Sequence, residues 1–245
     1  MIRSTRRLRV ALGLCLLALG VFGASSAQGA VRWLVKGTEP TKAAPKELKG
    51  SLATTGILHT KIGGNEVLFE CSKGTLVNAR LEEAGGISTS NTPAKVKFEE
   101  CLTKINGVTN AACLPTNNGT EPKVIATNEG TAQLALHSTK EGVTKIKSNV
   151  EETVGGLKQP VYARIKMSTE CPIGSNIPVI GPTLAVKDVG GNAGLETEAV
   201  SHEIEEFQPL TEIWALSRTE EHKAKVLGKA KIETITSELW SGKPE

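Results

Sequence analysis

Histidines are the first residues to consider for metal binding or acid–base chemistry. The chain has four of them, His59, His137, His202 and His222. No two have the short spacing of a metal-binding pair. The window 202–206 (HEIEE) starts like the zinc motif H-E-x-x-H but lacks the second histidine. On a helix, His202 and Glu206 would share a face opposite Ile204, which we interpret as solvent-exposed. We therefore expect no metal ion and no cofactor.

Acidic residues and nucleophiles also form no catalytic pattern. Adjacent glutamates occur at 82–83, 99–100, 151–152, 205–206 and 220–221. Neighbouring residues on a strand point to opposite faces, so such a pair does not converge on one substrate bond. There is no G-x-S-x-G motif, and Asp188, the only aspartate, lies in a glycine-rich stretch. We expect a protein without catalytic activity. An exported hydrolase whose site assembles only in the fold is the alternative.

The cysteines indicate structural cross-links. Leaving aside Cys15 in the apolar N-terminal run, four remain: Cys71, Cys101, Cys113 and Cys171. Their number is even and their spacings do not suit zinc, so we expect two disulfides. Cys71 and Cys171 each continue the apolar face of an alternating stretch, whereas Cys101 is out of phase with Phe98. This parity predicts the pairs Cys71–Cys171 and Cys101–Cys113, unless a β-bulge shifts the phase.

The elements that carry these residues are predicted to be short strands. Glycine- and asparagine-rich turns recur along the chain and separate stretches in which apolar and polar residues alternate. The clearest alternation is 161–171 (VYARIKMSTEC). The pattern predicts an all-β fold, an antiparallel β-sandwich or β-barrel stabilised by disulfides. The stretches 195–207 and 218–228 fit either a strand or one short helix.

The N-terminus has the order of a secretory signal peptide. Residues 1–9 are basic, 10–23 apolar and 24–30 small, and Ala27 is the best cleavage position. Removal of 1–27 leaves 25 basic and 26 acidic residues, a net charge of −1. This balance argues against nucleic-acid binding, and no stable membrane span is expected after cleavage. We expect a flexible leader at 28–50, with a short strand near Trp33–Val35, and a single β-rich domain at 51–245.

Aromatic residues are too few for an extended carbohydrate-binding platform. They make up 3% of the chain, and sugar rings normally stack on such side chains. Phe69 and Phe98 fall on apolar strand faces and are expected in the core. Tyr162 falls on the polar face of its strand and is expected to be the most exposed aromatic residue.

Strand ends marked by Glu-Cys give the chain a family resemblance. The segments Phe69–Cys71, Phe98–Cys101 and Thr169–Cys171, with Cys113 between them, resemble a group of uncharacterised secreted actinobacterial proteins. The resemblance covers about residues 55–210 and implies export and β architecture, but no activity. We therefore expect a secreted or cell-envelope β-domain with a structural, adhesive or binding role, whose partner is an envelope component or another protein. A carrier of a small apolar ligand is a further alternative.

Overall fold

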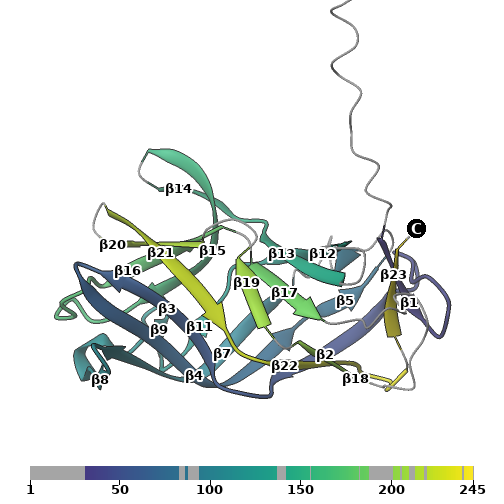
Figure 1. The fold of residues 1–245 in the computed structure, drawn as a ribbon, viewed down its shortest axis with the longest axis horizontal. Helices are drawn as coiled ribbons and strands as arrows, with labels where there is room; N and C mark the ends of the chain where they lie inside the picture. Colours follow the sequence, from purple (N-terminus) through teal and green to yellow (C-terminus); the bar gives the residue numbers. More distant parts are fainter. Residues whose placement is uncertain are drawn as a thin grey trace, which may run out of the picture.

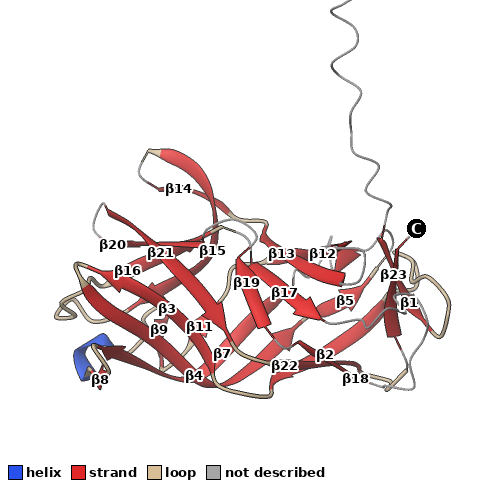
Figure 2. Ribbon diagram, viewed as in Figure 1, coloured by secondary structure: helices blue, strands red, loops and turns tan. Residues whose placement is uncertain are grey.

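The computed structural model describes the chain as an almost purely β protein. The described residues are 31–82, 86–87, 94–136, 142–154, 156–181, 183–187, 201–204, 206–209, 213–217, 220–238 and 240–244. The expected signal peptide at 1–27, Asp188 and His137 lie outside them. One 3₁₀ turn, η1 (Ala111–Cys113), stands beside the strands, in blue in Figure 2.

The strands are short except for three, which have 13, 11 and 10 residues. They are β1 (Val31–Val35), β2 (Lys46–Leu52), β3 (Gly56–Ile62), β4 (Asn65–Val77), β5 (Ala79–Leu81), β6 (Gly86–Ile87), β7 (Lys95–Ile105), β8 (Val108–Thr109), β9 (Thr116–Asn117), β10 (Glu121–Pro122), β11 (Ile125–Ala126), β12 (Gly130–Leu136), β13 (Gly142–Ser148), β14 (Glu151–Val154), β15 (Leu157–Lys166), β16 (Asn176–Ile180), β17 (Thr183–Lys187), β18 (Ser201–Ile204), β19 (Glu206–Pro209), β20 (Ile213–Ser217), β21 (Glu220–Leu227), β22 (Ala230–Thr234) and β23 (Trp240–Pro244).

One antiparallel sheet curls until its pairings close into a barrel, which confirms the predicted fold class. Its spine is the β4–β7 pair, in register from Val67 opposite Ile105 to Val77 opposite Lys95. Strand β3 lies on the other edge of β4, followed by β21 and β20. The β14–β15 hairpin projects from the body, as Figure 1 shows. Strands β1 and β23 pair with each other at one end of the molecule.

Glycines lie where the chain bends between neighbouring strands. Strands β2 and β3 lie on the same edge of β4, with the bend at residues 53–55 between them. Strand β21 ends and β22 begins beside this bend. Gly228, between the two strands, lies so close to it that an added Cβ would be 3.2 Å from the Cα of Gly56. Glycine permits such close approach and local bending, which a closed sheet needs.

Two apolar clusters make up most of the core, beside a small third one formed by Val154, Val161 and Ile180. The larger one surrounds both disulfides and includes Phe69 and Ile165, each about 1% exposed. The smaller one is centred on Trp33 and Trp240, whose ring centroids are 5.4 Å apart. The predicted strand at Trp33–Val35 is therefore present as β1. Strand β2 also begins inside the range 28–50, which we expected to be a flexible leader, and its Leu48 is buried.

The stretches that fitted both helix and strand are strands where they are described. Residues 201–204 and 206–209 form β18 and β19, and β21 covers most of 218–228. The helical alternative is therefore wrong for these residues. Their place in the sheet, with β18 against β22 and β21 between β20 and β3, outweighs a helical hydrophobic pattern.

The predicted disulfide pairing is wrong. The cysteines are joined as Cys71–Cys101 and Cys113–Cys171, with Cα separations of 4.0 and 4.8 Å. The parity argument failed at Glu100, whose φ of 56° interrupts the extended backbone. This interruption shifts the alternation, so that Cys101 and Thr103 point inward. Cys101 then lies directly opposite Cys71 in the β4–β7 pair.

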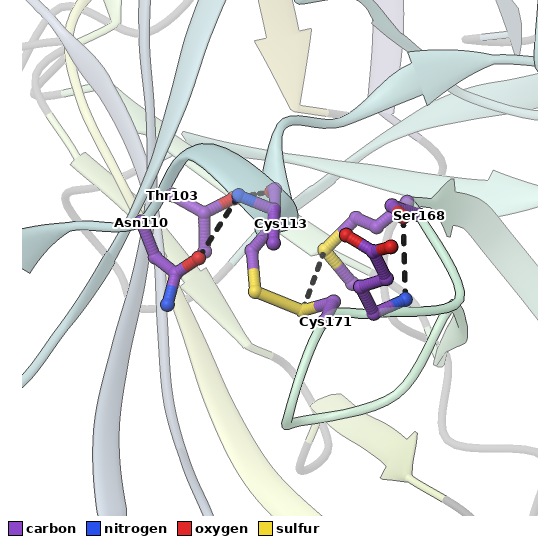
Figure 3. The surroundings of a disulfide bond; sticks show 8 residues. Thr103, Asn110, Cys113, Ser168 and Cys171 are labelled. Atoms are coloured by element: carbon purple, nitrogen blue, oxygen red, sulfur yellow. Dashed lines mark hydrogen bonds between the residues drawn. A yellow bond between two sulfur atoms is a disulfide. The ribbon is translucent and has the colours of Figure 1, made fainter.

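The second disulfide joins two turns, as Figure 3 shows. Asn110 caps the 3₁₀ turn by accepting a hydrogen bond from the Ala112 N–H at 3.0 Å. The Thr103 hydroxyl donates to the Cys113 carbonyl, which holds this turn against β7. Strand β15 ends at Lys166, and the Cys171 N–H donates to the Ser168 carbonyl in a turn. Cys171 has thus left the alternating strand from which its direction was predicted.

A carboxylate near the C-terminal strand ties three segments together. Glu238 lies 2.8 Å from the Lys46 ammonium and 3.3 Å from that of Lys36. Thr236 also donates a hydrogen bond to it, at 2.9 Å. The hydrogen bond from Lys46, followed by that from Thr236, lowers the pKa of Glu238 from its ordinary 4.5 to about 2.

We expect the Glu238 carboxylate to make the free energy of unfolding depend on pH in the acidic range. Because its pKa is lower in the folded chain, its stabilising effect is complete above about pH 4.5 and is lost as the pH falls towards 2. Denaturant midpoints of the wild type and Glu238→Gln should therefore differ at pH 7 and converge near pH 2. Glu47→Gln, which alters an exposed glutamate of β2, is the control. An equal difference at both pH values would contradict the assignment.

Candidate functional site

The histidines do not assemble a catalytic group in the described part of the chain. His59 lies 3.1 Å from Glu66 on the neighbouring strand, and its side chain is 33% exposed. His202 lies in β18 opposite Ile232, and His222 in β21 opposite Ala215. His202 is therefore in a strand, not on the helix that would have placed it beside Glu206.

Metal-binding and membrane-spanning features were also sought among the described residues. There, no three histidine, cysteine, aspartate or glutamate side chains are arranged to hold a metal ion. The same residues include no helix with the length and apolar character needed to cross a membrane.

The most distinctive feature is an apolar cavity of about 100 Å³ inside the barrel. Its walls come from β2, β3, β4, β7, β11, β15, β16, β21 and β22. The lining residues are Gly50, Ser51, Leu52, Gly56, Ile57, Leu58, Phe69, Cys71, Gly74, Thr75, Leu76, Val96, Phe98, Ile125, Tyr162, Ala163, Ile165, Val179, Val226, Leu227, Ala230 and Ile232.

The cavity lies where the two apolar clusters meet. Phe69 and Ile165 belong to the larger cluster, whereas Leu76 and Ile232 pack against the smaller one. None of the described lining residues is charged, and the surface that they present is almost entirely carbon. Such a cavity disfavours water, which needs two to four polar partners, and favours an apolar occupant.

Three glycines in the wall let neighbouring side chains pack directly on the backbone. A Cβ on Gly74 would lie 2.9 Å from Leu52 Cγ and 3.1 Å from Phe98 Cδ1. A Cβ on Gly50 would lie 2.6 Å from Leu76 Cδ1, and one on Gly56 would lie 3.1 Å from Leu52 Cδ1. Leu52 and Leu76 thus lie over backbone that carries no side chain. Larger residues at the glycine positions would force both leucines, which also line the cavity, to move.

The sheet is interrupted beside Gly74. The pairing of β4 with β3 stops at Cys71, and that with β2 is limited to Thr75 opposite Ser51. Between these points the bend at 53–55 turns towards the link between β21 and β22, where the Ala53 N–H donates to the Lys229 carbonyl at 2.8 Å. Ser51 and Thr75, which are exposed residues, contribute to the cavity wall at this interruption.

Tyr162 is a cavity residue that the sequence pattern placed on the wrong side. It was expected to be exposed, but it is 6% exposed and lines the cavity. The register between β15 and β16 shifts between Val161 and Ala163, so Tyr162 is the extra residue of a β-bulge. A bulge redirects a side chain and breaks the alternation, and no residue type in this stretch signals it.

No known protein explains the cavity by similarity. Compared with models of protein families, with curated proteins and with solved structures, the chain matches none. The resemblance described above therefore carries no family assignment.

Proposed function

We propose that this chain is an exported, non-catalytic binding domain that carries a small apolar molecule inside its barrel. The observation that supports this most is the uncharged cavity of about 100 Å³, whose walls come from both apolar clusters. A dry cavity of about 150 Å³ lined by leucine, isoleucine and phenylalanine is large enough to bind benzene. The present cavity is smaller but is not fully enclosed.

Export is the second part of the proposal. The two disulfides are of the kind that persist in oxidising compartments, and the N-terminal sequence has the order of a signal peptide. The cavity favours the carrier over a purely structural or adhesive role, because a filled core would serve those equally well. Among the described residues, no observation favours the exported hydrolase.

Benzene and xenon should raise the thermal stability of the purified disulfide-bonded chain. At a benzene concentration of ten times Kd, the expected gain is about 1.4 kcal/mol, which corresponds to roughly 3–6 °C for a chain of this size. Differential scanning calorimetry and NMR titration of the methyl groups that line the cavity would measure both effects. Shifts should be confined to residues such as Ala163 and Val179, which line the cavity.

A filled cavity provides the control. Ala163→Leu adds carbon atoms to a wall residue that is 3% exposed, and the response to benzene should be lost. Val108→Leu, at a side chain that is 70% exposed, should respond like the wild type. A melting temperature that neither xenon nor benzene changes would contradict the carrier function. So would a benzene response in Ala163→Leu equal to that of the wild type.

A further inference from the structure

We infer that the ligand is a small uncharged hydrocarbon that makes no hydrogen bond, and that Gly74 and Leu52 set its size. This inference rests on the proposed function, because it names the ligand class and the specificity-determining residues of the same cavity. Two observations support this inference: the apolar chemistry of the cavity wall, and the packing of Leu52 against Gly74.

The wall presents almost no polar surface to a ligand. Its described residues are uncharged; Ser51 and Thr75 are exposed residues, and Tyr162, also in the wall, is buried and has an interaction within the protein. Most wall positions lie in paired strands, where the backbone N–H and C=O groups already form hydrogen bonds between strands. A hydroxyl or carboxyl group carried inside would lose its water without gaining a partner, and this costs free energy.

The volume sets an upper limit on the occupant. If about 150 Å³ holds the six carbons of benzene, a cavity of about 100 Å³ holds about four. Benzene therefore fits only by using the part of the cavity that is not enclosed, so six carbons in a compact shape are the upper limit. A fused double ring would have to displace wall atoms, which close-packed interiors resist.

Leu52 is the wall side chain whose replacement should alter the size of the cavity most. Its Cδ1 lies 3.0 Å from the ideal Cβ position of Gly74 and 3.1 Å from that of Gly56, so the side chain rests on both glycines. A methyl group at position 74 would force Leu52 or Phe98 to move. Removing the Leu52 side chain beyond Cβ would instead extend the cavity along the glycine surface.

The first experiment tests polarity. Isothermal titration calorimetry with the disulfide-bonded chain would compare benzene with phenol, which differ by one hydroxyl. We expect phenol to bind at least about tenfold more weakly, because that hydroxyl is left without a partner. Equal affinities would overturn the inferred ligand class while leaving the carrier intact. If neither compound nor cyclopentane binds, the proposed function itself fails.

The second experiment tests size with the rigid series cyclopentane, benzene and naphthalene. In the wild type naphthalene should bind at least about tenfold more weakly than benzene. Leu52→Ala should narrow that ratio to about threefold or less, and Gly74→Ala should weaken benzene binding about tenfold. Ser72→Ala, two residues from Gly74 and exposed on the outer face of β4, should leave all three affinities unchanged.

Unfolding of a variant does not obscure this result. Circular dichroism establishes that each variant is folded, and Leu52→Val, with a smaller loss of volume, should shift the naphthalene-to-benzene ratio in the same direction as Leu52→Ala. Ratios that stay at the wild-type value in both folded variants would overturn the role of Leu52. Benzene binding that is unchanged in folded Gly74→Ala would overturn that of Gly74.

Discussion

Replacing Cys113 and Cys171 together with alanine should lower the free energy of unfolding by about 4 kcal/mol. The bridge closes a sequence separation of 58 residues, and the loop-entropy model gives this value for a loop of that length. The disulfide also joins the capped 3₁₀ turn to the turn after β15, so both lose their anchor. Urea titration of the purified double variant measures the loss.

The other bridge supplies the comparison. Cys71 and Cys101 are 30 residues apart and lie on directly paired strands. Their replacement by alanine should cost about 0.6 kcal/mol less, since the closed loop is half as long. Peptide mapping without reduction should find both bridges as described. A peptide that links Cys71 to Cys171 would contradict the structure, and so would a Cys113/Cys171 double variant as stable as the wild type.

Phe69→Ala should lower the free energy of unfolding by about 3–5 kcal/mol, as large-to-small changes of buried aromatics do. Phe69 is 1% exposed and belongs to both the larger apolar cluster and the cavity wall. Its removal enlarges the existing cavity instead of creating a separate one. Benzene at saturation should therefore restore more stability to this variant than it adds to the wild type, as measured by denaturation with and without benzene.

An exposed apolar residue controls for the general effect of truncation. Leu157 is 66% exposed at the start of β15, and Leu157→Ala should change stability by less than about 0.5 kcal/mol. Benzene should stabilise it as it does the wild type. If benzene stabilises Phe69→Ala no more than it stabilises Leu157→Ala, the space left by the Phe69 ring is not continuous with the cavity.

The fold class was predictable because alternation reports directly on which face of a strand is buried. Val67, Phe69 and Cys71 alternate with more exposed residues as expected, and all three are buried. Alternation also fails locally wherever the backbone leaves the extended conformation. Glu100 with its positive φ reversed the inferred direction of Cys101, and with it the disulfide pairing.

The cavity could not be predicted for a different reason. Its wall includes glycines within strands, and a sequence pattern treats a glycine as a turn or a weak strand position. That Gly50 lies under Leu76, and Gly74 under Leu52, depends on contacts between strands that are not neighbours in the sequence. The inward turn of Tyr162 depends likewise on a register shift against β16.

The pairing of β1 with β23 has a consequence for how the chain is made. Val31 lies opposite Pro244, so two strands more than 200 residues apart must meet before the Trp33–Trp240 contact can form. Strand β2 similarly needs β22. Pairings this distant in sequence slow folding, because a long loop must close before any contact stabilises it. We therefore expect β1 and β2 of a nascent chain to stay without their partners until β22 and β23 have been synthesised.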